Sequence, residues 1–296
     1  MQFYAKVRTL TYVIQTFIVM NKNKLKHRIK WFSSLFVPKK VIRANVYYLS
    51  PNQRLEGKKI IITGGSRGLG YAMAKKFLAE GAKVLITGRN ESAIKESATT
   101  LGCLYLVFDV SDTSQISSFL SIADNLLGGA NVLVNNAGIS LHEGNIGNVT
   151  EEGYDKQFDT NLRGAYFLTQ AFLKMYIKEK RCDGSVLFVS SERGTYVDDI
   201  PYGLIKTSIN SLTQGLSYLY RRNYIRINAI APGITATEMT GRSEDNIYAN
   251  NYSTGRFYLP NEVAEVACFL LSNASGCLSG QIIVCDNGYS VNTYRK

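Results

Sequence analysis

A regular alternation of short apolar segments with longer helical segments is the feature that most restricts the fold of this chain. Each apolar segment has the length of a strand and is rich in β-branched residues, and a segment with helical spacing follows it. Strands of this kind, separated by helices, are typical of a parallel sheet covered on both faces. Because crossovers between parallel strands are right-handed, the pattern predicts an α/β fold with a doubly wound sheet in three layers, α/β/α. The seven predicted strands are Lys59–Thr63, Lys83–Thr87, Leu104–Phe108, Asn131–Asn135, Ser185–Ser190, Ile225–Ile230 and Gln281–Val284.

Charge divides the 296 residues into two parts. Residues 1–56 hold eleven Lys or Arg and one acidic residue, a net charge of +10, whereas residues 57–296 hold 23 basic and 22 acidic residues. Such an asymmetry predicts a basic N-terminal extension over 1–56 and a single domain over 57–296. Because the domain itself is nearly neutral, no nucleic-acid partner is expected.

The extension contains a candidate amphipathic helix over residues 22–36. A basic helix with an apolar, aromatic face is typical of contact with a membrane surface. The alternatives are an arm that packs against protein, which the apolar stretch 41–49 favours slightly, and a nucleic-acid tail. The apolar stretch 10–20 is too short to span a bilayer, no cleavage site follows it, and Met20 is an alternative start. The apolar face of the helix consists of Leu25, Ile29, Phe32 and Phe36.

The cysteines indicate the compartment. Five are present, an odd number, and none forms a Cys-x-x-Cys pair. Neither a disulfide framework nor a metal site is therefore expected, and a reducing compartment agrees best with this pattern. We expect a cytoplasmic protein, with peripheral contact at the inner membrane surface as the alternative.

A glycine-rich turn follows the first predicted strand. It has the sequence Thr63-Gly-Gly-Ser-Arg-Gly-Leu-Gly70 and leads directly into a predicted helix. Glycines let the backbone approach a pyrophosphate, and the helix N-terminus supplies N–H donors and the positive end of the dipole. The turn is a candidate phosphate-binding loop. Its spacing differs from G-x-G-x-x-G, and a simple tight turn is the alternative.

Tyr202 and Lys206 are four residues apart on a predicted helix and therefore share one face. An ammonium group near a phenol favours the phenolate, so we expect the pKa of Tyr202 to lie below about 10. Such a tyrosine can pass a proton to or from a substrate oxygen. For this pair alone, a solvated position on an amphipathic helix is the alternative.

Five motifs in chain order resemble the short-chain dehydrogenase/reductase family. They are the turn 63–70, Asn135-Asn-Ala-Gly138, Ser190-Ser191, Tyr202 with Lys206, and Pro232-Gly233. The resemblance spans roughly residues 57–290. It implies an NAD(P)-binding Rossmann-fold catalytic domain over 57–296, of the compact single-domain branch that includes 3-oxoacyl-[acyl-carrier-protein] reductases.

The resemblance implies four catalytic residues, which are Asn161, Ser191, Tyr202 and Lys206. Tyr202 resembles the acid/base, and Lys206 resembles its activator and a ligand of the nicotinamide ribose. Ser191 would hydrogen-bond the substrate carbonyl. It is preferred because Gly194 follows at the distance usual in the family, and Ser190 is the alternative. Asn161 matches the residue that positions a water molecule in the proton relay.

The same resemblance places cofactor contacts at the ends of the strands. Asp109 resembles the acid that meets the adenine amino group. Arg89 stands where an acidic residue would bind the ribose 2′-OH of NAD. With Arg67 it offers two guanidinium groups to a 2′-phosphate, so NADP(H) is expected and NAD(H) stays open. The implied cofactor-binding residues are Thr63, Gly64, Ser66, Arg67, Gly68, Leu69, Gly70, Arg89, Asp109, Val110, Asn135, Ala137, Gly138, Tyr202, Lys206, Pro232, Gly233, Thr235 and Thr237.

The implied function is an NADP(H)-dependent oxidoreductase that interconverts a carbonyl and a secondary alcohol. One alternative is a 3-oxoacyl-carrier-protein reductase, and another is a catalytically silent nucleotide-binding scaffold held at a membrane surface. The segment between Ser191 and Tyr202 is shorter and more charged than is common in the family, and the predicted lid at 238–258 is polar. The first feature departs from the family pattern at the substrate pocket, and the polar lid favours a polar, hydroxylated small-molecule substrate. The cations that would meet an acidic carrier are Lys174, Lys178, Lys180 and Arg181.

Assembly is the last expectation. Family members pair through two long helices, which here are predicted at about 151–180 and 202–222. The second of these carries more apolar residues at helical spacing than one sheet face needs. The sequence therefore predicts a homodimer or a homotetramer.

Overall fold

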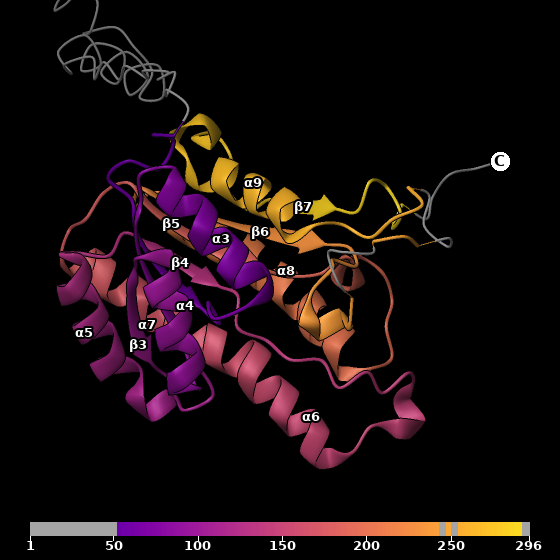
Figure 1. The fold of residues 1–296 in the computed structure, drawn as a ribbon. Coiled ribbons are helices and arrows are strands. Elements are labelled where there is room, and N and C mark those ends of the chain that lie inside the picture. The colour runs from indigo at the N-terminus through magenta and orange to yellow at the C-terminus, as the bar shows by residue number, and fades with distance from the viewer. Residues whose placement is uncertain (1–51, 243–246, 250–253, 292–296) are drawn as a thin grey trace, which may run out of the picture. The chain divides into compact units, whose positions relative to one another are not determined.

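Seven parallel strands form one sheet, in the order β3-β2-β1-β4-β5-β6-β7. Helices flank this sheet (Figure 1). The computed structural model describes residues 52–242, 247–249 and 254–291, so the predicted helix at 22–36 lies outside the described residues. Every strand begins within one residue of its predicted start, which confirms the doubly wound α/β fold. The strands are β1 Lys59–Thr63, β2 Lys83–Gly88, β3 Leu104–Val107, β4 Val132–Asn135, β5 Gly184–Val189, β6 Ile225–Pro232 and β7 Ile282–Cys285.

The strand order reverses direction between β1 and β4. The chain first builds outward from β1 through β2 to β3 and then returns, so that β4 pairs with the other side of β1, with Ile61 opposite Leu133. In an open α/β sheet, such a reversal leaves a crevice at the carboxyl ends of the strands, where ligands bind. A ligand site is therefore expected at the carboxyl ends of β1 and β4.

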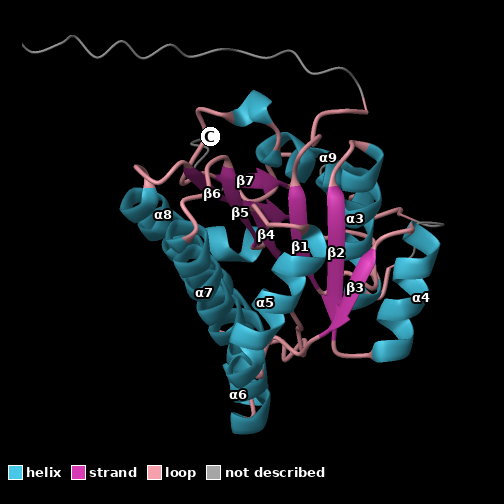
Figure 2. Cartoon of the chain, turned by 90° about the vertical axis from the view of Figure 1, so that its left-hand side faces the viewer, coloured by secondary structure: helices cyan, strands magenta, loops and turns pink. Residues whose placement is uncertain are grey.

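Helices cover both faces of the sheet, and Figure 2 shows the strands between the two layers. Alternate residues of β1 point to opposite faces, so Ile60 and Ile62 join one buried cluster and Ile61 joins the other. None of the helices in the described ranges is long and apolar enough to cross a membrane. One layer contains α3 Gly68–Ala79, α4 Glu91–Leu101 and α9 Pro260–Leu271; the other contains α5 Ile116–Leu127, α6 Glu151–Phe158, α7 Gly164–Lys178 and α8 Pro201–Tyr220.

The helix predicted over 151–180 is interrupted. A π-helical segment, Asp159–Arg163, separates α6 from α7. Gly164 follows it, and a Cβ atom there would lie 2.2 Å from the carbonyl oxygen of Val110. The chain thus needs glycine where α7 meets the loop after β3. Short π-helical segments are frequent at functional sites.

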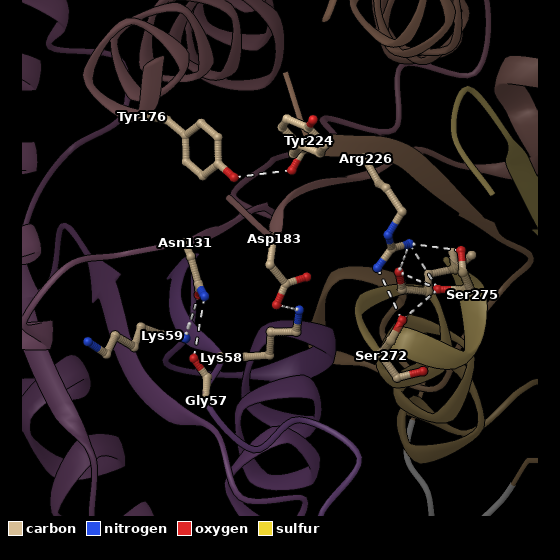
Figure 3. Close-up of polar contacts among 11 residues, drawn as sticks. Gly57, Lys58, Lys59, Asn131, Tyr176, Asp183, Tyr224, Arg226, Ser272 and Ser275 are labelled. Carbon is tan, nitrogen blue, oxygen red and sulfur yellow. Dashed lines mark hydrogen bonds and ion pairs between the residues drawn. The ribbon is translucent and has the colours of Figure 1, made fainter. Parts of the chain in front are cut away.

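Polar contacts brace the amino-terminal edge of the sheet (Figure 3). Lys58 is buried just before β1, and its Nζ lies 2.6 Å from Oδ2 of Asp183, just before β5. Arg226 at the start of β6 donates to the carbonyl oxygen of Ser272 and to the hydroxyl of Ser275, at 3.1 and 2.9 Å. These two residues follow α9, so the guanidinium group satisfies acceptors at the end of that helix. The side chains at the amino-terminal edge therefore make structural contacts, and the functional site is expected at the carboxyl edge.

Residues just before the charge-based boundary at residue 57 contact the domain. Leu55 is fully buried in the core, and its N–H donates to the carbonyl oxygen of Glu80 at 2.9 Å. Arg54 also binds Glu80, and this pairing helps to lower the pKa of the carboxyl group to about 2. Residues 52–56 therefore pack with the domain, because burial rather than net charge decides where a domain begins.

Candidate active site

The residues singled out from sequence gather along the carboxyl edge of the sheet. They leave neighbouring strands, so the sheet order alone brings them together. The first turns of α8 add Tyr202 and Lys206 to this edge. The other predicted residues follow the strands in turn: 63–70 at β1, Arg89 at β2, Asp109 and Val110 at β3, 135–138 at β4, Ser190 and Ser191 at β5, and 232–237 at β6.

Lys206 lies beneath Tyr202, one turn further along α8. The helix begins with Pro201, whose fixed backbone angle suits the first helical position. Nζ of Lys206 lies 5.3 Å from the centroid of the Tyr202 ring and donates to the carbonyl oxygen of Val189 at 2.8 Å. Only 6% of the Lys206 surface is exposed, and this burial lowers the pKa of its ammonium group to about 8.

The pKa of Tyr202 is raised, which corrects the sequence-based expectation. Desolvation of the phenol is the largest cause, whereas the nearby Ser191 hydroxyl and the charge of Arg193 act in the opposite direction. The expectation was wrong because it considered only the charge of Lys206. That ammonium group is directed to the Val189 carbonyl, and burial outweighs the remaining electrostatic effects.

The two neighbouring serines have different surroundings. The Ser190 hydroxyl donates to Oδ1 of Asn210 on α8 at 2.7 Å. The Ser191 hydroxyl accepts from the N–H of Arg193 at 3.3 Å and is close enough to Tyr202 to lower the pKa of its phenol. Of the two, Ser191 is therefore the one beside the phenol. Asn210 was not identified from the sequence, because its role depends on how α8 packs against β5.

Asn161 binds the backbone of the segment that follows β4. Its Nδ2 donates to the carbonyl oxygen of Ile139 at 2.7 Å, and its Oδ1 accepts from the N–H of the same residue at 2.8 Å. The side chain is 3% exposed and belongs to the π-helical segment. The arrangement joins that segment to the active-site end of β4.

The glycine-rich turn leaves the N-terminus of α3 open. Gly64 and Gly68 have φ angles of +65° and +54°, which favour glycine. A Cβ atom on Gly70 would lie 2.2 Å from the Gly64 carbonyl oxygen, so the turn is closed tightly on itself. Arg67, at the N-cap of α3, makes no side-chain capping hydrogen bond. The first N–H groups of the helix are thus available to an anion.

Thr63 and Asn136 join the turn to β4. The Thr63 hydroxyl oxygen accepts from the N–H groups of Asn136 and Ala137, both at 3.0 Å. Nδ2 of Asn136 donates in return to the carbonyl oxygens of Thr63 and Gly64. Asn136 was missing from the predicted site residues, and its place inside the Asn135–Gly138 motif was the available indication. Its amide holds together the two strands that flank the crevice.

Comparison with known proteins identifies the family. A family model described as enoyl-(acyl carrier protein) reductase matches residues 64–290. The chain belongs to the short-chain dehydrogenase/reductase family. It is 34% identical over 248 residues to a 3-oxoacyl-[acyl-carrier-protein] reductase of Chlamydia muridarum, covering 80% of this chain and 99% of the relative. It is 31% identical over 253 residues to a galactitol 2-dehydrogenase of Agrobacterium fabrum, covering 79% and 98%.

Solved structures of the family have the same fold. A 3-ketoacyl-(acyl-carrier-protein) reductase from Brucella melitensis, complexed with NADH, has a TM-score of 0.72 and 28% identity, covering 80% of this chain and 99% of that one. A levodione reductase has a TM-score of 0.73 and 27% identity, covering 80% and 99%. As a short-chain dehydrogenase/reductase, this chain is an oxidoreductase acting on CH–OH or C=O groups with a nicotinamide nucleotide.

The two arginines predicted at the cofactor have different surroundings. Arg89 at the end of β2 is exposed and forms no ion pair with the residues that the structure describes. Arg67 instead pairs with Glu238 at 2.7 Å, although both side chains are largely exposed. Asp109 accepts from the N–H and the hydroxyl of Ser111, at 2.9 and 2.7 Å. Of these two arginines, Arg89 is thus the one whose guanidinium group has no carboxylate partner among the described residues.

Two of the charged side chains in the segment between Ser191 and Tyr202 pair with each other. Arg193 binds both carboxylate oxygens of Asp198, at 2.5 and 2.6 Å. Asp199 accepts from the N–H of Ile146 at 2.9 Å, which ties the segment to the loop after β4. Glu192 makes no side-chain hydrogen bond, and its pKa is raised to about 7, mainly by burial. Among the described residues, no cluster of three or more His, Cys, Asp or Glu side chains is arranged to hold a metal.

Proposed function

We propose that this chain interconverts a carbonyl group and a secondary alcohol with NADP(H), and that Tyr202 is the acid/base. The proposal depends on one observation. The Ser191 hydroxyl, the Tyr202 phenol and the buried Lys206 ammonium group lie close together, at the same edge of the sheet as the open N-terminus of α3. A proton donor and a second hydrogen-bond donor for one substrate oxygen are what carbonyl reduction requires.

The residues at the crevice fit a nicotinamide dinucleotide. The free N–H groups at the start of α3 suit a pyrophosphate, and Gly64 and Gly68 keep side chains away from it. Arg89 would pair with a 2′-phosphate, which favours NADP(H); NAD(H) is the alternative. The exposed pair of Arg67 with Glu238 is worth less than about 1 kcal/mol, so Arg67 can also turn to a phosphate. When bound, the nicotinamide supplies or accepts the hydride.

The protein residues would handle the proton. Desolvation keeps the Tyr202 phenol protonated at neutral pH, so its oxygen can donate to the substrate oxygen as the carbonyl is reduced. Ser191 would donate a second hydrogen bond to that oxygen. Lys206, with a pKa of about 8, retains a charge that favours the phenolate left behind. Asn161 would keep the chain after β4 in place for the relay.

A screen of NADPH and NADH oxidation against a library of carbonyl compounds tests this function. We expect turnover with at least one carbonyl compound, and Tyr202→Phe should lower it about 10²- to 10⁴-fold while cofactor binding persists. Cofactor binding without any turnover would instead support the silent scaffold. Undiminished turnover in Tyr202→Phe would remove this residue from the chemistry.

Reduction of a 3-oxoacyl group on a carrier protein is a second candidate. The 34% identity to a reductase with that substrate favours it. Of the four cations predicted to meet an acidic carrier, Arg181 already binds Asp124, at 2.6 and 2.7 Å. The cations that remain available to bind the acidic carrier protein are Lys174, Lys178 and Lys180. Activity on a 3-oxoacyl carrier protein that declines in a variant with these three lysines changed to Glu would favour this candidate.

A second copy of the chain is the partner that we propose for α7 and α8. A groove between these helices is lined by apolar side chains that include Leu162, Tyr166, Phe167 and Leu212. The Tyr166 and Phe167 side chains are 44% and 41% exposed. Adjacent apolar exposure of this kind marks an interface. A homodimer or homotetramer would cover it.

For the N-terminal extension, residues 1–56, we propose one of two roles in a cytoplasmic enzyme. It either contacts a membrane surface peripherally or packs against protein. A net charge of +10 within 56 residues would draw it to an anionic surface. Flotation with anionic and neutral vesicles at low salt tests this. Co-flotation with anionic vesicles alone supports membrane contact; failure to float favours the packed arm.

A further inference from the structure

Glu192 is the residue that follows Ser191, and it is almost completely buried. It is 4% exposed, and Oε2 is shielded from solvent without a hydrogen bond. Oε1 also has no hydrogen-bond partner among the described residues but is not shielded to the same degree. A buried carboxyl group without hydrogen bonds is unfavourable, so its presence beside the catalytic centre calls for a function.

A second unpaired polar atom lies near the same point. Tyr258 is 7% exposed, and its hydroxyl group is buried without a hydrogen bond. Thr254 is near enough to lower the pKa of the phenol, although burial raises it more, and the Thr254 hydroxyl donates to the carbonyl oxygen of Arg256 instead. A Cβ atom on Gly233 would lie 2.9 Å from Oε2 of Glu192 and 2.8 Å from Cε2 of Tyr258. Glu192, which follows β5, and Tyr258, which precedes α9, therefore place their side chains together near Gly233 at the end of β6. Tyr258 is held there because its N–H donates to the Ile234 carbonyl oxygen at 3.1 Å.

The surrounding charged groups do not satisfy Glu192. Asp286 approaches from the end of β7, but its two carboxylate oxygens accept from the N–H groups of Gly288 and Ser290. Arg193 is committed to Asp198, with bonds of 2.5 and 2.6 Å. Burial and the negative charge of Asp286 therefore raise the pKa of Glu192, with only a smaller opposing effect from Arg193.

We propose that Glu192 and Tyr258 form a subsite that binds a substrate hydroxyl group next to the reacting carbon. The substrate would then be a polyol or the corresponding hydroxyketone, a statement that rests on the proposed oxidoreductase function. A hydroxyl group can donate to the carboxylate and accept from the phenol at the same time, which matches the two unpaired atoms. The position agrees with this role, because Glu192 adjoins Ser191 and its charge acts on Tyr202.

Oxidation kinetics of the full chain test the subsite. The probes are five- and six-carbon alditols, with cyclohexanol as a secondary alcohol that lacks a second hydroxyl group. Glu192→Leu should lower the alditol-to-cyclohexanol ratio of kcat/KM about 10- to 150-fold, the range for one charge-assisted hydrogen bond. Tyr258→Phe should lower the ratio less. Asp199→Asn is the matched control, because it removes an exposed carboxylate from the same segment.

Thermal unfolding separates recognition from a structural role. Leucine replaces an unpaired buried carboxyl group with an apolar side chain of similar size, so Glu192→Leu should melt no lower than the wild type. A drop of several degrees, or an unchanged kcat/KM ratio, overturns the subsite. Turnover of cyclohexanol but of no alditol by the wild type also overturns it while the proposed function stands. Absence of turnover with every alcohol and carbonyl contradicts both.

Discussion

The Ser190 hydroxyl donates to Oδ1 of Asn210 at 2.7 Å. The neighbouring Ser191 hydroxyl instead lies close enough to Tyr202 to lower the pKa of the phenol. Ser190 thereby docks α8 onto the end of β5, and Ser191 is the serine for which we propose a catalytic role. Two adjacent residues of the same type thus have separable roles.

Substitution of the two serines should give opposite results. Ser191→Ala should lower turnover about 10²- to 10³-fold with little change in melting temperature, because one donor to the substrate oxygen is lost. Ser190→Ala should affect turnover less and cost about 1–3 kcal/mol of stability, because the Asn210 acceptor is left unpaired. Steady-state kinetics and thermal unfolding of both variants measure this. The reverse order of turnover would make Ser190 the catalytic serine.

Arg89→Ala should discriminate between the two nicotinamide cofactors. A charge-assisted contact with a 2′-phosphate is worth about 1.5–3 kcal/mol, so NADPH should bind roughly 10- to 150-fold more weakly and NADH almost unchanged. Fluorescence titration with both cofactors measures this. Arg221→Ala is the control, since Arg221 follows the far end of α8 and donates to the carbonyl oxygen of Tyr218. Equal losses for NADPH and NADH would contradict an Arg89–phosphate contact.

Glu192→Gln should become more stabilising relative to the wild type as pH rises. The folded protein raises the pKa of Glu192 from 4.5 to about 7, so between these values the folded state binds more protons than the unfolded state. Wild-type stability therefore falls as pH rises through this window, by roughly 3 kcal/mol at most. Gln does not titrate, so the difference in melting temperature should be larger at pH 8 than at pH 5. A difference independent of pH would mean that Glu192 is charged throughout.

Phe167→Asp should dissociate the proposed oligomer. The side chain is 41% exposed beside Tyr166 in the groove between α7 and α8, so a carboxylate there would be buried unpaired in an interface. Light scattering at micromolar concentration should report a lower mass than for the wild type. Asp substituted for the exposed Val197, outside the groove, is the control. A wild-type monomer would contradict the proposed pairing.

The features that could be predicted from sequence depend on short-range order along the chain. The strands, the glycine-rich turn and the one-turn spacing of Tyr202 and Lys206 follow from local periodicity and from the backbone freedom of glycine. The seven strand positions were accurate for this reason. The place of the motifs at strand ends also located the site, because parallel strands all present their carboxyl ends at one edge.

Tertiary structure decided the features that depend on burial and on partners distant in the chain. Ser190 meets Asn210 twenty residues later, and Arg67 meets Glu238 across 171 positions. The raised pKa of Tyr202 and the convergence of Glu192 and Tyr258 on Gly233 arise only when separate strand ends are brought together. Local sequence determines which residues reach the edge of the sheet. Desolvation and long-range packing determine which of them have paired polar groups and which are left free to bind a ligand.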